Sequence, residues 1–427
     1  MNVDHASQSQ QQQQQQQQEW TRPRVPFPPQ SFDEPQLHRA RRNPTVCLED
    51  GSTRTLYLTR DDHCQQQQQQ QQRVAYHLLP KKEKLHNGRK GYILYAVVFE
   101  QVPSSSPHQR PPHGCCYRET NRVVVIKKLK KQWLRANHVH QDNKNNNDPN
   151  ANAENPYNEI AASELVGDNH HVLKMEAALY DDKNLYLVMP FVGQDLLRCL
   201  WKSTVHNNDN DDDEDACAAD VPVLLETLVH NLLHLQRFGL IHRDVSPENI
   251  VVHQEYHERS CPLIDLAMAL RAVSLENNPQ FISAGQRVCG KLPYMAPEIY
   301  TQSVLDHTRV DVWSLGCVLF VVWTNQRLYD CIGDRSYLFF IQEGGLVHQD
   351  RLESTLELLL QLCLQEEQER RMIPPEFVQL TSRIQAVLHH LDHSQRDLLS
   401  RMLQPIPHQR ITAEEILQHE WVANRMQ

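Results

Sequence analysis

The sequence of 427 residues predicts an α+β protein of two lobes, a β-rich small lobe followed by an α-helical large lobe. Runs of β-branched and alternating apolar residues predict strands at residues 92–99, 123–126 and 185–188. Beyond residue 191, apolar residues recur at helical spacing, so helices are expected at residues 221–238 and 311–323. Hydrophobic residues make up 40% of the chain, which is enough for a buried core. Strands followed by helices favour two packed lobes with a ligand-binding cleft between them.

Charge and hydropathy argue against several classes of protein. The chain has 53 Asp and Glu against 43 Lys and Arg, a formal net charge of −10, which argues against binding to nucleic acid through its phosphates. No apolar run approaches the ~18 residues of a membrane span, and the N-terminal residues lack a signal-peptide pattern. The 11 cysteines are scattered, so reduced thiols are expected. We therefore expect an intracellular protein, cytoplasmic or nuclear, without nucleic-acid or membrane partners, and the sequence leaves the oligomeric state open.

Low-complexity segments set the expected domain boundaries. Residues 1–43 are rich in Gln and Pro and are expected to form a disordered tail. Residues 44–73 contain a second glutamine run and are expected to form a linker with one strand-like piece at residues 55–59. The predicted globular domain spans residues 74–423, with a small lobe at 74–190, a large lobe at 191–423 and inserted surface loops at 103–120, 137–156 and 206–220.

The segment from His242 to Asn249, with the sequence HRDVSPEN, carries the clearest chemical signal. Asp244 and Asn249 lie on one predicted loop, so the first can accept a proton from a hydroxyl group while the second holds a metal ion. Asp265 follows at the end of an apolar strand. One base with two metal-binding oxygens is what phosphoryl transfer needs, because positioning and charge neutralisation do most of the catalytic work.

These motifs, in this order, resemble those of the eukaryotic protein kinases of the Ser/Thr type. Seven of the eight positions of the pattern H-R-D-L/V-K-P-E-N agree. Further motifs of the family match residues 265–267 (DLA for D-F-G), 296–298 (APE) and 311–316 (DVWSLG), and a closing-helix motif begins at Arg410, whose family counterpart pairs with the A-P-E glutamate. The resemblance covers residues 74–423 and implies the bilobal protein-kinase fold.

The resemblance also implies an activity, namely transfer of the γ-phosphate of ATP, with Mg²⁺, to Ser or Thr hydroxyls of protein substrates. Asp244 would be the catalytic base, and Asn249 and Asp265 the metal ligands. Lys127, in the run Val-Val-Ile-Lys, would hold the α- and β-phosphates, paired with a glutamate. Glu159 is the best-placed partner for Lys127, with Glu154 and Glu164 as the competing choices.

The nucleotide would lie between a glycine-rich loop and a hinge. The implied nucleotide-binding residues are Leu85, Gly88, Gly91, Ile93, Val125, Lys127, Pro190, Val192, Asp195 and Val251. Met189 is the implied gatekeeper, and the first glycine of the loop is replaced by His86. Gly88 and Gly91 retain the residue type that lets backbone N–H groups approach phosphates closely.

Two further departures from the family pattern concern the catalytic loop. Ser246 stands where Ser/Thr kinases have a lysine, and Lys291 stands where they have a threonine. Our hypothesis is that Lys291 supplies the positive charge that Ser246 cannot, while Ser246 supplies the hydroxyl group. Independent drift in a weakened enzyme is the alternative.

Regulation and two rival functions complete the expectations. Arg243, next to Asp244, suggests control by an upstream kinase acting on Ser283 or Ser274. A pseudokinase scaffold that binds nucleotide without turnover would explain the departures from the family motifs. A polyglutamine interaction protein with a kinase-shaped body is the third reading. Retention of all four polar groups that phosphoryl transfer requires favours an active enzyme.

Overall fold

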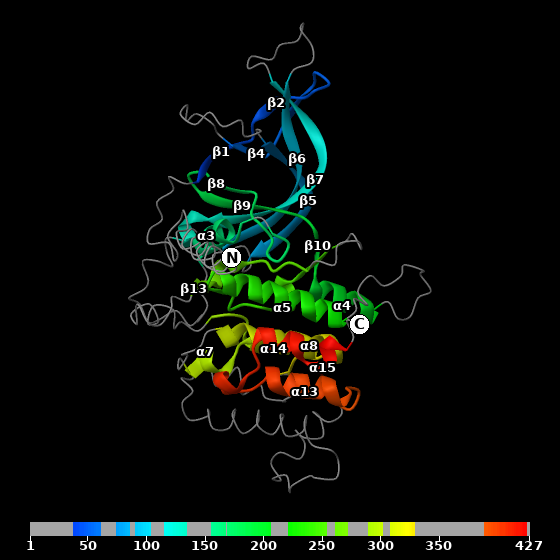
Figure 1. Cartoon of the computed structure of the whole chain (residues 1–427). Helices are drawn as coiled ribbons and strands as arrows, with labels where there is room; N and C mark the ends of the chain where they lie inside the picture. The colour runs from blue at the N-terminus through cyan, green and yellow to red at the C-terminus, as the bar shows by residue number, and fades with distance from the viewer. Residues whose placement is uncertain are drawn as a thin grey trace, which may run out of the picture. The chain divides into compact units, whose positions relative to one another are not determined.

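The computed structural model describes residues 37–60, 74–85, 90–103, 115–134, 155–167, 169–205, 221–253, 261–271, 289–301, 308–328 and 388–424. The described residues fall into two compact units (Figure 1). The β unit contains the described residues from 37 to 134 and residues 173–191, and the α unit contains those from 155 to 172 and from 192 to 424. Taken separately, one unit is rich in strands and the other is mainly helical, as the sequence predicts.

The β unit is a closed barrel whose strands are hydrogen-bonded in the order β1, β4, β5, β6, β7, β9, β8. β1 pairs with β8 in parallel, and the other neighbouring strands are antiparallel. The bounds are β1 (His38–Arg42), β4 (Leu58–Arg60), β5 (Val74–Leu85), β6 (Gly91–Pro103), β7 (Cys115–Lys130), β8 (Ala177–Tyr180) and β9 (Asn184–Pro190), with a separate hairpin of β2 (Thr45–Cys47) and β3 (Thr53–Thr55). The three strands predicted in the first half of the chain are confirmed as parts of β6, β7 and β9.

Alternate residues of the long strands fill the barrel. Leu94 and Ala96 of β6, Val124 and Ile126 of β7 and Val188 of β9 are buried in one apolar cluster. Successive side chains of a strand point to opposite faces, so these positions are spaced two residues apart. Complete burial of a Val, Leu or Ile side chain is worth roughly 1.5–3 kcal/mol, so this row of residues largely determines the register of the sheet.

The predicted N-terminal boundaries are wrong, because residues before 74 complete the barrel. β1, inside the predicted tail of residues 1–43, pairs with both β4 and β8, and β4 lies inside the predicted linker of residues 44–73. β1 reads as polar in sequence because Ala40 is its one buried residue, and its place comes from backbone pairing. The predicted loop at 103–120 is also too long, since β7 begins at Cys115.

The α unit combines helices with short strand pairs. Its elements are α3 (Pro156–Val166), β10 (Gly193–Asp195), α4 (Leu196–Val205), α5 (Val221–Arg237), β11 (Leu240–Ile241), η3 (Pro247–Asn249), β12 (Val251–His253), η4 (Leu266–Met268), β13 (Leu270–Arg271), η5 (Leu292–Tyr294), α7 (Pro297–Thr301), α8 (Thr308–Thr324), α13 (His393–Met402), η9 (Pro407–Gln409), α14 (Ala413–Gln418) and α15 (Glu420–Ala423). β10 pairs with β12, and β11 pairs with β13. The two predicted helices are confirmed as α5 and α8. The predicted small lobe of residues 74–190 included α3, which belongs instead to the α unit.

α8 runs through the core of the α unit, which explains why its sequence is apolar on all sides. Its consecutive residues Val312 and Trp313 are completely buried. At Gly316 a side chain would meet Leu403 and Met402, because α13 packs directly against this point of α8 (Figure 1). Among the described residues, no helix is both long and apolar enough to span a membrane.

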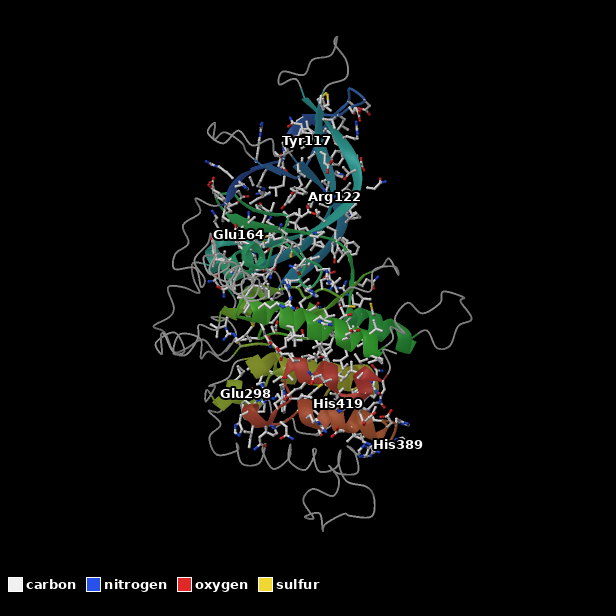
Figure 2. All side chains as sticks on the ribbon, in the orientation of Figure 1. Tyr117, Arg122, Glu164, Glu298, His389 and His419 are labelled. Atoms are coloured by element: carbon white, nitrogen blue, oxygen red, sulfur yellow. The ribbon has the colours of Figure 1, made fainter. Side chains whose placement is uncertain are left out.

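A buried ion pair joins two distant motifs of the α unit. Arg410 donates to both carboxylate oxygens of Glu298, with N–O distances of 2.6 and 2.9 Å. Both side chains are almost completely buried, and the guanidinium group also donates to the carbonyl oxygens of Arg309 and Gln404. Figure 2 marks Glu298 in the α unit. The pairing expected between the closing-helix arginine and the A-P-E glutamate is therefore confirmed.

Candidate active site

The loop that carries Asp244 is anchored from two sides. Asp311 at the start of α8 accepts hydrogen bonds from the backbone N–H groups of His242 and Arg243, both at 2.8 Å. Burial raises the pKa of Asp311, and the two backbone donors and His242 oppose that rise. The imidazole Nε2 of His242 lies 3.0 Å from the carbonyl oxygen of Ile264. The loop is thus fixed both to α8 and to the segment that leads to Asp265.

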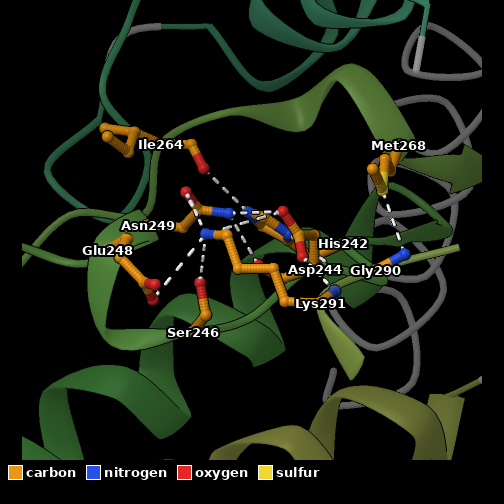
Figure 3. Close-up of polar contacts among 9 residues, drawn as sticks. All are labelled: His242, Asp244, Ser246, Glu248, Asn249, Ile264, Met268, Gly290 and Lys291. Carbon is orange, nitrogen blue, oxygen red and sulfur yellow. Dashed lines mark hydrogen bonds and ion pairs between the residues drawn. The ribbon is translucent and has the colours of Figure 1, made fainter. Parts of the chain in front are cut away.

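Asp244 has a fixed orientation, because both of its carboxylate oxygens accept hydrogen bonds. The backbone N–H of Lys291 donates to Oδ1 at 2.9 Å, and the side-chain amide of Asn249 donates to Oδ2 at 2.7 Å (Figure 3). Only 8% of the residue is exposed. Burial raises the pKa of Asp244, and the nearby Lys291 is the largest influence opposing that rise. The result is a buried, oriented carboxylate suited to accept a proton.

The side chain of Lys291 lies at the centre of the polar groups of this loop. Its Nζ donates to Ser246 Oγ at 2.7 Å and to Asn249 Oδ1 at 3.3 Å (Figure 3). The same ammonium group is 3.7 Å from a Glu248 carboxylate oxygen and 4.0 Å from Asp244 Oδ2. Ser246 itself is completely buried. The structure therefore brings together the cation and the hydroxyl group of the two positions that depart from the family pattern.

Gly290 allows Lys291 to approach the catalytic loop so closely. Its φ of 101° lies in a region that favours glycine, and a Cβ there would be 2.5 Å from the carbonyl oxygen of Arg243. The backbone N–H of Gly290 is 3.1 Å from the sulfur of Met268 (Figure 3). Beyond Lys291, η5 is held to α8 because Ser314 donates to the carbonyl oxygen of Tyr294 at 2.8 Å.

Asp265 is brought next to Asn249 by the backbone. The N–H of Ile264 donates to the carbonyl oxygen of Asn249 at 3.0 Å, so the two predicted metal ligands belong to adjacent segments. Asp265 has a φ of 64°, an unusual value for a residue other than glycine that marks a constrained turn into η4. The charge of Asp265 is also close enough to raise the pKa of Asp244.

α3 places Glu159 in the same unit and packs against η4. Its N-cap, Asn155, uses its side chain to accept from the N–H of Tyr157 and its own N–H to donate to the carbonyl oxygen of Ala267. The side chain of Asn158 donates to the carbonyl oxygens of Ala267 and Ala269. Our sequence analysis did not assign a role to Asn158; its one signal is its position beside the expected glutamate.

The predicted nucleotide-binding residues of the sheet share one face of the β unit. Ile93 is opposite Lys127 in the β6–β7 register, and Val125 is opposite Met189 in the β7–β9 register. All four are only partly buried, whereas the opposite face fills the barrel. Gly91 has a structural role as well, because a Cβ there would collide with the carbonyl oxygen of Lys128.

The remaining predicted residues have more varied positions. Asp195 is opposite Val251 in the β10–β12 pair, and its carboxylate accepts from the N–H of Arg198 at 3.0 Å and forms an ion pair with the same side chain. Pro190 ends β9 opposite Val124, and Val192 follows in the α unit. The structure gives Leu85 as the last residue of β5. Four predicted residues lie outside the described residues: Gly88, Glu154, Ser274 and Ser283.

The comparison with protein families decides the identity of the fold. The family model for the protein kinase domain matches residues 113–422, which is more than half of the chain. The chain belongs to the protein kinase family. This confirms the resemblance found in the HRDVSPEN, DLA, APE and DVWSLG motifs, and the site around Asp244 is the part of the kinase domain that contains the first of them.

Similar proteins with curated names are kinases of the Ser/Thr type. The chain is 27% identical over 260 residues to the serine/threonine-protein kinase cds1 of Schizosaccharomyces pombe, covering 59% of this chain and 45% of that protein. It is 30% identical over 164 residues to the ribosomal protein S6 kinase 2 alpha of Xenopus laevis, covering 38% of this chain and 20% of that protein. It is 24% identical over 208 residues to the serine/threonine-protein kinase PLK4 of Drosophila willistoni, covering 48% and 20%. The matches therefore span less than half the length of these relatives.

Proposed function

We propose that this kinase-family chain is an active protein kinase that transfers the γ-phosphate of ATP to Ser or Thr hydroxyls of protein substrates. The observation that carries the proposal is the geometry around Asp244, a buried carboxylate oriented by two donors with an ammonium group 4.0 Å away. Pro247 and Glu248 before Asn249 resemble the Ser/Thr kinases, as do the similar proteins. In this proposal the β unit is the small lobe and the α unit is the large lobe of a bilobal fold.

Asp244 is the proposed base. A substrate hydroxyl group bound at its carboxylate would be oriented for attack and would transfer its proton there as the new bond to phosphorus forms. The two hydrogen bonds from Lys291 and Asn249 hold the carboxylate in one orientation, which removes the entropy cost of positioning it during the reaction. Exclusion of water by burial strengthens these interactions.

The residues present fit a magnesium ion. Asn249 offers an amide oxygen and Asp265 a carboxylate, the oxygen ligands that Mg²⁺ prefers. Among the described residues no group of three or more His, Cys, Asp or Glu forms a metal cluster. That agrees with a magnesium site completed by substrate phosphates and water rather than by a full protein cage. When bound, the metal would neutralise charge on the phosphates. The role of Asn249 requires that its Oδ1 exchange the hydrogen bond from Lys291 Nζ for the metal.

Lys291 and Ser246 are proposed to divide the work of one conventional lysine–threonine pair. The ammonium group comes from the segment after Gly290, and the hydroxyl comes from the catalytic loop. The 2.7 Å hydrogen bond between them supports exchange of the two side chains in place, with the charge kept next to Asp244. A cation there stabilises negative charge on the transferring phosphate. Lys291 is therefore a proposed catalytic residue and Ser246 a positioning residue.

Nucleotide binding is proposed for the partly buried face of the β unit. Ile93 and Val125 would contact the base, and Lys127 of the same face would bind the α- and β-phosphates, paired with Glu159 of α3. Val251 completes the apolar contact, while Pro190, Val192 and Asp195 supply backbone and ribose contacts. Leu85, Gly88 and Gly91 form the glycine-rich loop in this proposal. The register that gives Ile93, Val125 and Lys127 one common face is the observation that supports it.

An upstream kinase is a further proposed partner. Arg243 is buried next to Asp244, and its Nε donates to the carbonyl oxygen of Met268 at 2.9 Å. A phosphate on Ser283 or Ser274 would pair with such an arginine and set the conformation of the loop that carries it. Phosphopeptide mapping of protein from cells, with Ser283→Ala and Ser274→Ala as comparisons, tests this proposal. Absence of phosphate at both residues in active protein would contradict it.

The deciding experiment is transfer of labelled phosphate from ATP and Mg²⁺ to a panel of basic and acidic proteins. The expected result is label on serine or threonine that is lost in Asp244→Asn. A melting-temperature shift with ATP and no transfer under any condition would contradict the proposal and establish a nucleotide-binding pseudokinase. Deletion of residues 1–72 with loss of partner binding and unchanged ATP behaviour would point to the polyglutamine interaction reading.

A further inference from the structure

Two cysteines of the β unit lie side by side without being bonded. Cys47 ends β2 and Cys116 lies near the start of β7, and the two sulfur atoms are 3.9 Å apart. Cys47 is partly exposed, while Cys116 is buried. They are 69 residues apart in sequence, so their approach is a product of the fold.

Several contacts keep this part of β2 on β7. Leu48 and Tyr117, the residues that follow the two cysteines, form a parallel bridge. The N–H of Glu49 donates to the carbonyl oxygen of Tyr117 at 3.0 Å. The carboxylate of Glu49 accepts two hydrogen bonds from Arg118, at 2.6 and 2.8 Å. Figure 2 marks Tyr117 on the barrel. Each residue from 47 to 49 thus has a contact with its counterpart from 116 to 118.

The same segment also has apolar support. Leu48 and Tyr117 pack against a cluster formed by Val46, Leu56, Ala75 and Phe99. Neighbouring strands lie about 4.8 Å apart, and a disulfide needs Cα atoms roughly 4.4–6.8 Å apart. Residues adjacent to a parallel bridge therefore have Cα atoms at a spacing that a disulfide can span.

We infer that Cys47 and Cys116 form a reversible disulfide when the protein meets a disulfide oxidant such as glutathione disulfide. The bond covalently attaches the segment of β2 and β3 to β7, a segment that the sequence analysis assigned to a linker. This site is independent of the proposed kinase activity, because neither cysteine belongs to the proposed active site.

The reaction balances in two exchange steps. The Cys47 thiolate attacks one sulfur of glutathione disulfide, which releases one glutathione thiolate and leaves a mixed disulfide on Cys47. The Cys116 thiolate then attacks the Cys47 sulfur and releases the second glutathione thiolate. Two protons leave the cysteine thiols, each cysteine sulfur loses one electron, and glutathione disulfide is reduced by two electrons. Desolvation and the neighbouring Cys116 raise the pKa of the Cys47 thiol, so the first step is expected to accelerate as pH rises.

The test is oxidation of the full chain with glutathione disulfide, followed by non-reducing peptide mapping with mass spectrometry. The expected product is an internal link between the peptides that contain Cys47 and Cys116, reopened by dithiothreitol. The link must vanish in Cys47→Ser and in Cys116→Ala and persist in Cys115→Ser, which changes the neighbouring thiol in sequence. A stable glutathione adduct on Cys47, or a link that follows Cys115 instead, would overturn the inference.

A second readout does not depend on mapping. Closing a long loop with an unstrained disulfide stabilises the folded state, so the oxidised protein is expected to melt roughly 5 °C higher than the reduced protein. Cys47→Ser should remove this difference, and because Cys47 is only partly buried the variant is expected to fold. An equal difference between oxidised and reduced protein in wild type and Cys47→Ser would contradict the inference.

Discussion

Lys291 is the residue whose replacement tests the exchange of charge and hydroxyl group most directly. Its ammonium group contacts Ser246 and Asn249 and is 4.0 Å from Asp244, so Lys291→Met removes the cation and keeps much of the side-chain volume. We expect phosphotransfer to fall by ~100-fold, the effect of losing one electrostatic contact to the transferring group. Steady-state kinetics measures it, with Lys183→Met, an exposed lysine of the β unit, as the matched control.

The double variant Ser246→Lys with Lys291→Thr restores the arrangement of conventional Ser/Thr kinases. Because the two side chains already contact each other, the exchange is expected to recover turnover to within ~10-fold of the wild type. The two single variants should both be weaker than the double variant. If the double variant is as weak as the product of the two single losses, the positions act independently and the exchange is wrong.

Asp244 predicts the acidic limit of the pH profile. Burial raises its pKa, so the carboxylate takes up a proton at a higher pH than an exposed aspartate does, and activity is lost as pH falls through that raised pKa. Lys291 opposes the rise, so Lys291→Met should move the acidic limb to still higher pH. The measurement is kcat/KM between about pH 5 and 9 in both proteins. An acidic limb that stays in place in Lys291→Met would show that the base is not coupled to this cation.

At the scale of elements, the Arg410–Glu298 pair joins the segment before α14 to α7. Removing one partner leaves a buried charge unpaired, so Arg410→Ala is expected to lower the free energy of unfolding by about 3–5 kcal/mol. The matched control is Arg401→Ala, which breaks an exposed pair with Asp397 at 3.0 Å and should cost no more than ~1 kcal/mol. Chemical denaturation of both variants decides it. Equal losses would mean that burial does not distinguish the two pairs.

The elements that sequence reasoning found are those whose side chains alone define them. α8 is apolar on all sides, and β6 alternates long apolar and small residues, so both are legible without a structure. β1 is not legible, because four of its five residues are polar and its pairing rests on backbone hydrogen bonds with β4 and β8. Backbone pairing leaves no residue pattern to detect when a single side chain is buried.

The candidate site shows the same division at the scale of the whole molecule. Asp244, Asn249 and Asp265 were found from sequence because their chemistry requires specific residue types on short segments. The role of Asp311 in orienting the loop and the requirement for glycine at position 290 depend on backbone atoms more than 40 residues away. Such contacts have no local signature. The contact between Lys291 and Ser246 was foreseeable only because the two departures from the family pattern are complementary in charge.

The barrel predicts how the whole molecule responds to shortening at its N-terminus. Deletion of residues 1–60 removes β1 and β4, which opens the barrel between β5 and β8 and exposes the side of the core covered by Ala40 and Leu58. We expect a melting temperature lower by several degrees and rapid amide exchange along β5 and β8, because their backbone groups lose their partners. Deletion of residues 1–36 removes none of the described contacts and serves as the control. If both deletions melt alike, the segment before residue 74 is the linker that sequence composition suggests, and the barrel does not depend on it.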